Sequence, residues 1–115
     1  EYHTSADNLE MVNEDGLLGS FKVLRNLVDA FEVCLFPKVV VKGEPQLGKR
    51  NLYPSLSKKQ NSRRVSQSRM DIIAFCNGEN SIFEICNITK LPLSEVINEL
   101  EILIQAGLII ENFNP

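Results

Sequence analysis

The side chains best suited to chemistry lie at the start of the chain, in the run EYHTSADN. His3 is the only histidine among the 115 residues, and Asp7 follows it four positions later. A neutral imidazole is a good zinc ligand, and a neighbouring carboxylate can orient its ring. A metal site also needs several protein ligands. No second histidine or paired-carboxylate cluster supplies them. We therefore expect this chain alone to hold no cofactor and to be inactive as an enzyme.

These residues also have structural interpretations. A lone histidine is more often an ordinary surface residue than a metal ligand, because a metal site needs several ligands. Asp7 or Asn8 can cap the helix that follows, since a short polar side chain accepts a hydrogen bond from the free N–H groups of a first helical turn. Both interpretations stay open alongside a metal-binding role for His3.

A second candidate site is the polar loop GEPQLGKRNLYP. Lys49 and Arg50 follow a glycine, where a lysine and an arginine can bind a phosphate or a substrate carboxylate. The spacing is not that of a P-loop. The alternative is a solvated or internally paired basic loop without a ligand.

A long helix from Leu93 to Ala106 organises the C-terminal half. Pro92 suits its first turn, where a missing N–H costs nothing, and Gly107 suits its end, since glycine readily takes the left-handed conformation. Apolar residues recur at helical spacing and predict one buried stripe. They are Leu93, Val96, Ile97, Leu100, Leu103 and Ile104.

Two shorter helices and a strand surround this helix. One helix covers residues 70–76, and another begins at Ser81, where Glu84 stands at capping-box spacing. Residues 108–110 are typical of a short strand. Helix, short helix, turn, longer helix and strand is the order of a winged helix-turn-helix.

The N-terminal half predicts a further helix over residues 16–34 and a strand over 36–41. The helix has an apolar stripe that needs a larger partner surface than the small C-terminal domain provides. Its residues are Leu17, Leu18, Phe21, Leu24, Val28, Phe31 and Leu35.

The charge is strongly patterned. Residues 1–35 carry seven acids and two bases, residues 36–64 carry eight bases and one acid, and residues 65–115 again carry seven acids and two bases. A basic middle between acidic ends can bind those ends or an anionic partner. No run reaches the ~18 apolar residues of a membrane span. The three cysteines show no CxxC spacing and indicate a reducing, cytoplasmic setting.

Three features together resemble the C-terminal portion of a bacterial family of zinc aminopeptidase-like proteins: EYHTSADNL before an amphipathic helix, EPQLGKRNLYPSLS, and a final winged helix. The resemblance implies a zinc-dependent hydrolase of peptide-like substrates as the parent protein. It implies that His3 is the last protein ligand of the zinc, with Asp7 as a possible orienting neighbour. It also implies that the loop of Lys49 and Arg50 reaches the active-site rim, and that the other ligands lie before Glu1.

We accordingly expect a mainly α fold with a few short strands, in three parts. Residues 1–56 would be the C-terminal remnant of a peptidase-like α/β domain, contributing its last helix and strand. Residues 57–68 would be a basic linker, and residues 69–115 the winged helix-turn-helix domain.

DNA binding is the main rival function for the winged helix. A recognition helix needs basic and amide side chains, because phosphate neutralisation supplies much of DNA affinity. The long helix has no Lys or Arg, and its expected outer side carries Glu95, Glu99 and Glu101. On this placement Glu99→Ala should barely change stability. Arg69 is one of several bases that could contact a DNA backbone.

We therefore favour packing against the peptidase domain of the same protein or against a second subunit. Ile102 and Phe113 are candidate contacts, since neither belongs to the buried stripe. A DNA-binding transcriptional regulator and a stand-alone interaction module remain the alternatives.

Overall fold

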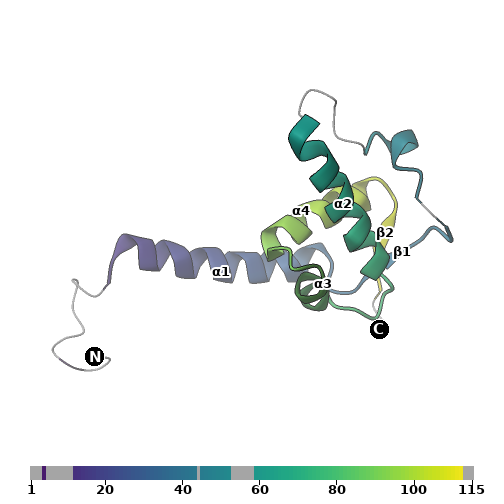
Figure 1. The fold of residues 1–115 in the computed structure, drawn as a ribbon. Helices are drawn as coiled ribbons and strands as arrows, with labels where there is room; N and C mark the ends of the chain where they lie inside the picture. Colours follow the sequence, from purple (N-terminus) through teal and green to yellow (C-terminus); the bar gives the residue numbers. More distant parts are fainter. Residues whose placement is uncertain (1–3, 5–11, 44, 53–58, 113–115) are drawn as a thin grey trace.

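The computed structural model describes residue 4 and residues 12–43, 45–52 and 59–112. Within them the chain forms mainly helices and one two-stranded sheet (Figure 1). In chain order the elements are α1 (Glu14–Val33), β1 (Pro37–Val39), the 3-10 helix η1 (Leu47–Arg50), α2 (Lys59–Phe75), α3 (Ile82–Thr89), α4 (Leu93–Gln105) and β2 (Ile109–Glu111). The predicted mainly α fold with a few short strands is confirmed. None of the described helices is long and apolar enough to cross a bilayer.

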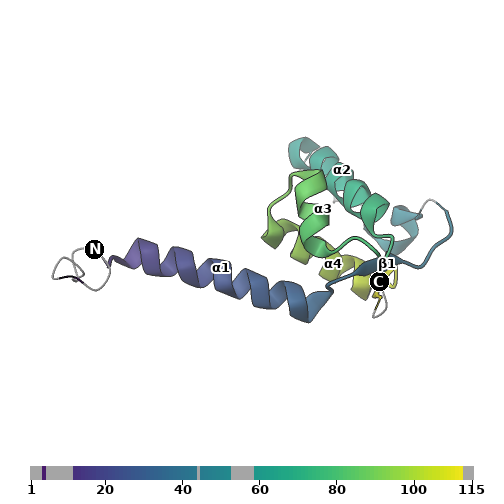
Figure 2. The same cartoon turned by 90° about the horizontal axis from the view of Figure 1, so that it is seen from below.

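Helix α1 projects from the other elements, and its C-terminal turns lie beside α4 (Figures 1 and 2). It begins after Asn13, whose side-chain oxygen accepts a hydrogen bond from the Gly16 N–H at 2.8 Å. A cap at Asp7 or Asn8 was one of the interpretations left open; Asn13 caps α1, and Asp7 and Asn8 lie outside the described residues. The radius of gyration is 18.1 Å, whereas a compact chain of this size has roughly 13 Å.

Helices α3 and α4 form the helix-turn-helix, and the predicted signals at the start of α3 and at both ends of α4 are confirmed. The Ser81 hydroxyl accepts a hydrogen bond from the Glu84 N–H at 3.3 Å, and the Glu84 carboxylate accepts one from the Ser81 N–H at 2.7 Å. The hydrogen bonds that the Ser81 N–H and hydroxyl donate to the Glu84 carboxylate, at 2.7 and 2.8 Å, hold the pKa of Glu84 below its ordinary value. Helix α4 starts directly after Pro92, and Gly107 follows it with a φ of +67°. Glycine takes that backbone angle readily because it has no Cβ.

The two strands join distant parts of the chain. They pair antiparallel, with Pro37 opposite Glu111 and Val39 opposite Ile109. Beside the pair, the Asn112 N–H donates to the Phe36 carbonyl at 2.8 Å. Strand β1 was expected in the segment before the winged helix. It lies instead in the sheet of the winged helix, because β2 is its hydrogen-bonded partner.

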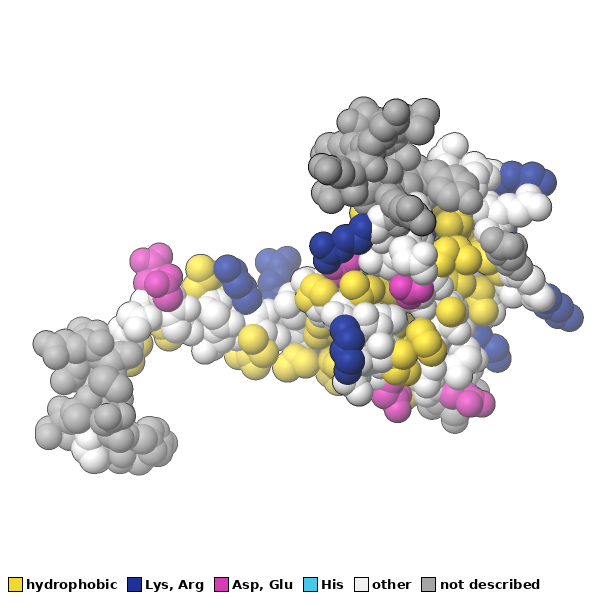
Figure 3. Space-filling view, viewed as in Figure 1, with side chains coloured by type: hydrophobic (Ala, Val, Ile, Leu, Met, Phe, Trp, Pro, Cys, Tyr) yellow, Lys and Arg dark blue, Asp and Glu magenta, His cyan; other side chains and the backbone are white. Residues whose placement is uncertain are grey.

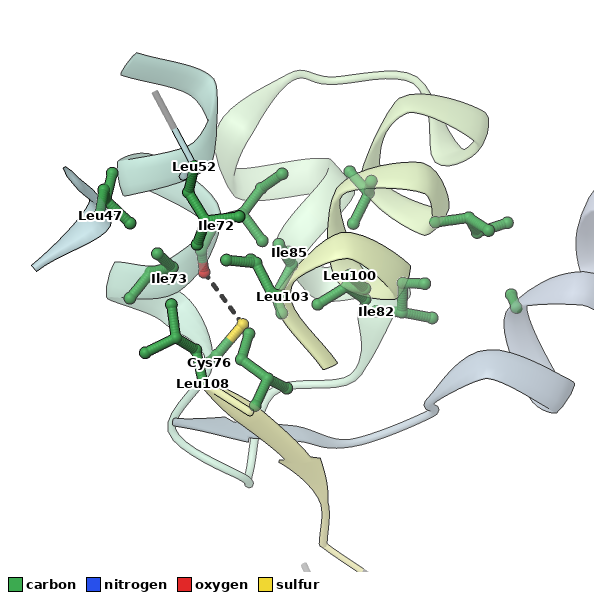
Figure 4. Close-up of a cluster of buried hydrophobic side chains, with 14 residues drawn as sticks. Leu47, Leu52, Ile72, Ile73, Cys76, Ile82, Ile85, Leu100, Leu103 and Leu108 are labelled. Atoms are coloured by element: carbon green, nitrogen blue, oxygen red, sulfur yellow. Dashed lines mark hydrogen bonds between the residues drawn. The ribbon is translucent and has the colours of Figure 1, made fainter. Parts of the chain in front are cut away.

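The core is built around α4 (Figure 4). Leu100 and Leu103 are fully buried, and Val96 and Ile97 of the predicted stripe are buried with them. Side chains from α2, α3 and the strand region close around this stripe. The labelled residues in Figure 4 are Leu47, Leu52, Ile72, Ile73, Cys76, Ile82, Ile85, Leu100, Leu103 and Leu108.

The predicted basic linker over residues 57–68 has a different local structure. Helix α2 already begins at Lys59, so residues 59–68 are helical rather than irregular. Ser68 is buried, and Leu47 and Leu52 from the preceding loop belong to the same core as α4. A segment that forms a helix leading into a core cannot act as a loose connection. How the whole protein divides into domains stays a prediction.

Candidate functional site

The N-terminal candidates, His3 and Asp7, lie outside the described residues, so their roles stay predictions. In the part of the chain that the structure describes, no group of three or more His, Cys, Asp or Glu side chains could hold a metal ion. The described residues therefore supply no zinc ligand set, and no chemical step is assigned to zinc.

The cysteines are free thiols with little nucleophilic character. Burial, reinforced by the nearby Glu111 carboxylate, raises the pKa of Cys34 to about 12. Burial, with a smaller effect of Cys34, raises the pKa of Cys76 to about 12. Burial also raises the pKa of Cys86. Because the thiolate is the reactive form, none of the three is poised for catalysis near neutral pH.

The second predicted candidate, Lys49 and Arg50, lies on a firmly anchored loop. Both side chains are exposed at the end of η1, between the buried residues Leu47 and Leu52. The Leu52 N–H donates to the Leu47 carbonyl at 3.0 Å, and the Asn51 N–H donates to the Gly48 carbonyl at 3.2 Å. The backbone thus closes on itself and presents two adjacent cations to solvent.

A buried ion pair fastens this loop to the core. The Arg69 Nε donates to the Glu99 carboxylate at 2.7 Å and its Nη2 donates to the other oxygen at 3.3 Å. The Arg69 Nη1 donates to the Leu52 carbonyl. Arg69 and Glu99 are 6% and 9% exposed. One guanidinium therefore ties α2 to both α4 and the end of the loop.

Neither member of this pair was found from the sequence. Arg69 was considered as one of several bases that could contact a DNA backbone, but its side chain is buried. Glu99 was predicted on the outer side of α4, and that prediction is wrong because it is buried too. Glu99 lies three residues after Val96 and four before Leu103, so it borders the buried stripe and α2 covers it. That spacing could have indicated its burial. The 30-residue separation of the two charges gave no local signal.

The outer side of α4 is acidic and amide-bearing. Asn98, Glu101 and Gln105 are exposed, and Glu95 is half-buried. Helix α4 contains no Lys or Arg. At its C-terminal end, Glu101 and Gln105 border a cavity of about 250 Å³ whose other side includes Val33 of α1. The C-terminal end of α1 therefore lies next to the C-terminal end of the outer side of α4.

Helix α1 carries the largest exposed apolar surface among the described elements. Its residues Leu17, Leu24 and Phe31 are each about 60% exposed, and hydrophobic side chains run along the helix in Figure 3. At the domain end, the ring of Phe31 contacts Phe83 edge-on, with centroids 6.0 Å apart. Extended apolar surfaces of this kind mark interaction sites. The α1 face consists of Leu17, Phe21, Leu24, Val28 and Phe31, which recur at alternating spacings of four and three.

Helices α2, α3 and α4, joined by the α3–α4 turn, and the β1–β2 pair define the class of protein as a winged helix-turn-helix. The family model described as winged helix-turn-helix matches residues 35–111. The chain belongs to that family, and the match includes β1, the anchored loop and all of α2.

A relative is provisionally named a polysaccharide biosynthesis protein with an aminopeptidase-like domain, from Clostridium acetobutylicum. It is 34% identical over 89 residues, which cover 73% of this chain and 20% of the relative. The chain thus spans about a fifth of that protein's length. No solved structure matches this chain at a significant level.

Proposed function

We propose that this chain is the C-terminal portion of an aminopeptidase-like protein, and that α1 and the winged helix pack against another domain of that protein or against a second subunit. The similarity to a much longer relative named for an aminopeptidase-like domain supports the first part. The exposed α1 face is the observation that carries the second part.

The size of the α1 face makes such a contact favourable. Fully burying one Val, Leu or Phe side chain contributes about 1.5–3 kcal/mol. Covering five residues that are each 54–63% exposed would thus contribute on the order of 5 kcal/mol. Within one chain, this gain is not reduced by the entropy that two separate molecules lose on association.

The acidic outer side of α4 favours protein packing over DNA binding. Glu95 and Glu101 would approach phosphates without a basic residue on the same helix. Ile102, a predicted contact, is 36% exposed on α4. Phe113, the other predicted contact, lies outside the described residues.

Hydrogen exchange tests the packing proposal. Amides in the N-terminal turns of α1 should exchange quickly in the 115-residue chain, because that part of its apolar face is uncovered and helices in proteins depend mainly on such packing for their stability. They should exchange at least a hundredfold more slowly in the full-length protein. Leu24→Glu should remove this protection, whereas Lys22→Glu, on the polar side of α1, should preserve it. Equal exchange of α1 in the two proteins would refute the proposal.

The catalytic part of the proposal concerns the full-length protein. There His3 would be one zinc ligand, and the remaining ligands would come from preceding sequence. Bound zinc would polarise a substrate carbonyl or activate water. His3→Ala should then lower the zinc content and abolish metal-dependent aminopeptidase activity. Unchanged zinc content in this variant would exclude His3 as a ligand.

A further inference from the structure

The tip of the anchored loop, Gly48 to Asn51, has a fixed shape although it is exposed. Both of its flanks are core residues, and Asn51 adopts the left-handed conformation with a φ of +54°. The two backbone hydrogen bonds across the tip close a tight turn. The backbone that carries Lys49 and Arg50 is therefore set before any ligand arrives, which lowers the entropic cost of binding.

The ion pair below the tip has no evident advantage for stability. Replacing a buried ion pair by apolar side chains of similar volume is often neutral or stabilising. The bonds from Arg69 to Glu99 and to the Leu52 carbonyl instead determine where the end of the loop lies on the core. All described buried side-chain polar atoms have partners, so the arrangement is complete.

The charges on the tip have no acidic partner among the described residues. The ion pairs among the described residues are Arg25–Asp29 and Arg69–Glu99, and neither includes a residue of the tip. Lys38 and Lys42 are also exposed and precede the loop, and basic side chains appear along this edge of the molecule in Figure 3. Among the described residues, the cations of this edge thus have no ion-pair partner and can attract an anion.

We propose that Lys49 and Arg50 form a binding site for a single oxyanion group, a carboxylate or a phosphate, and that Arg69 and Glu99 are its positioning residues. Arginine binds either group through two parallel N–H bonds, while lysine adds a point charge. This anion site is independent of the proposed packing and catalytic roles, because its tests need only the 115-residue chain.

Two probes distinguish the ligand sources: inorganic phosphate and N-acetylglycine, titrated into the isotope-labelled chain at low ionic strength. At least one should shift the amide resonances of residues 48–51 saturably. Lys49→Ala/Arg50→Ala should abolish the saturable shift. The control Lys22→Ala/Arg25→Ala removes the same two charges from α1 and should leave it unchanged. A loss of equal size in both variants, or no saturable shift with either probe, overturns the site.

The positioning role needs variants that leave the tip cations in place. Arg69→Met/Glu99→Met should keep the fold, accelerate amide exchange in the loop and weaken anion binding at least fivefold. Unchanged affinity in the folded variant overturns the role. If this variant does not fold, two substitutions in the turn test the role of the preset backbone. Asn51→Gly should preserve anion binding. Asn51→Val should weaken anion binding, because a β-branched residue is strained in the left-handed conformation. Equal binding by these two variants also overturns the role of a preset tip.

Discussion

Removing the Glu99 carboxylate should be among the most destabilising single changes in this chain. Glu99→Ala leaves the Arg69 guanidinium buried at 6% exposure without its counter-charge. Breaking a buried pair in this way costs about 3–5 kcal/mol. Leu100→Ala, next along α4, removes a fully buried side chain and should cost a similar ~2–5 kcal/mol. A small domain has only about 5–15 kcal/mol of stability in all.

Thermal and urea denaturation of the 115-residue chain, followed by circular dichroism, measure these effects. Each kcal/mol of lost unfolding free energy lowers the melting temperature of a small domain by about 4–8 °C, so Glu99→Ala should lower the melting temperature by more than ~10 °C. The control Glu101→Ala removes an exposed carboxylate from the same helix and should change stability by less than ~0.5 kcal/mol. Arg69→Met/Glu99→Met should recover most of the loss. Equal midpoints for Glu99→Ala and Glu101→Ala would refute the assignment of a buried pair.

Three further predictions concern the cap, the thiols and DNA. Ser81→Ala should cost about 0.5–2 kcal/mol. Since the folded pKa of Glu84 is lowered, its stabilisation is present above the unfolded value of 4.5 and is lost as pH falls through the folded pKa; Glu84→Gln and wild type should therefore converge in melting temperature at acidic pH. With an aromatic disulfide reagent at pH 8, Cys34 and Cys76 should react only as fast as the protein unfolds, and faster reaction of either than of Cys86 would contradict their burial. In a mobility-shift assay at about 0.15 M salt, the chain should not retard duplex DNA, and sequence-selective, salt-sensitive binding would promote the regulator alternative.

Local patterns predicted the helix-turn-helix well. The 3.6-residue stripe of α4, the Ser81 capping box and Gly107 at the helix end each depend on residues within a turn or two of each other. The α1 face was also predicted as a stripe in need of a partner, because amphipathicity is visible without tertiary structure.

What the sequence did not reveal depends on long-range packing. The pairing of Arg69 with Glu99 and that of β1 with β2 are set by the fold, and neither leaves a periodic signal. Basic and polar composition suggested a linker over residues 57–68, whereas α2 is stabilised by the core that its C-terminal half enters. The basic and polar composition favoured a solvent-exposed connection, but tertiary packing outweighed that local preference and stabilised a helix.

The β1–β2 pair also constrains the order of events during synthesis. Val39 leaves the ribosome 70 residues ahead of Ile109, its partner across the sheet. At about 5–20 residues per second, β1 waits roughly 4–14 s with the edge that pairs with β2 uncovered. The helices between them can form in that interval, but the winged helix cannot close until residues 109–111 emerge. A nascent chain stalled before residue 109 should therefore keep β1 open to a chaperone.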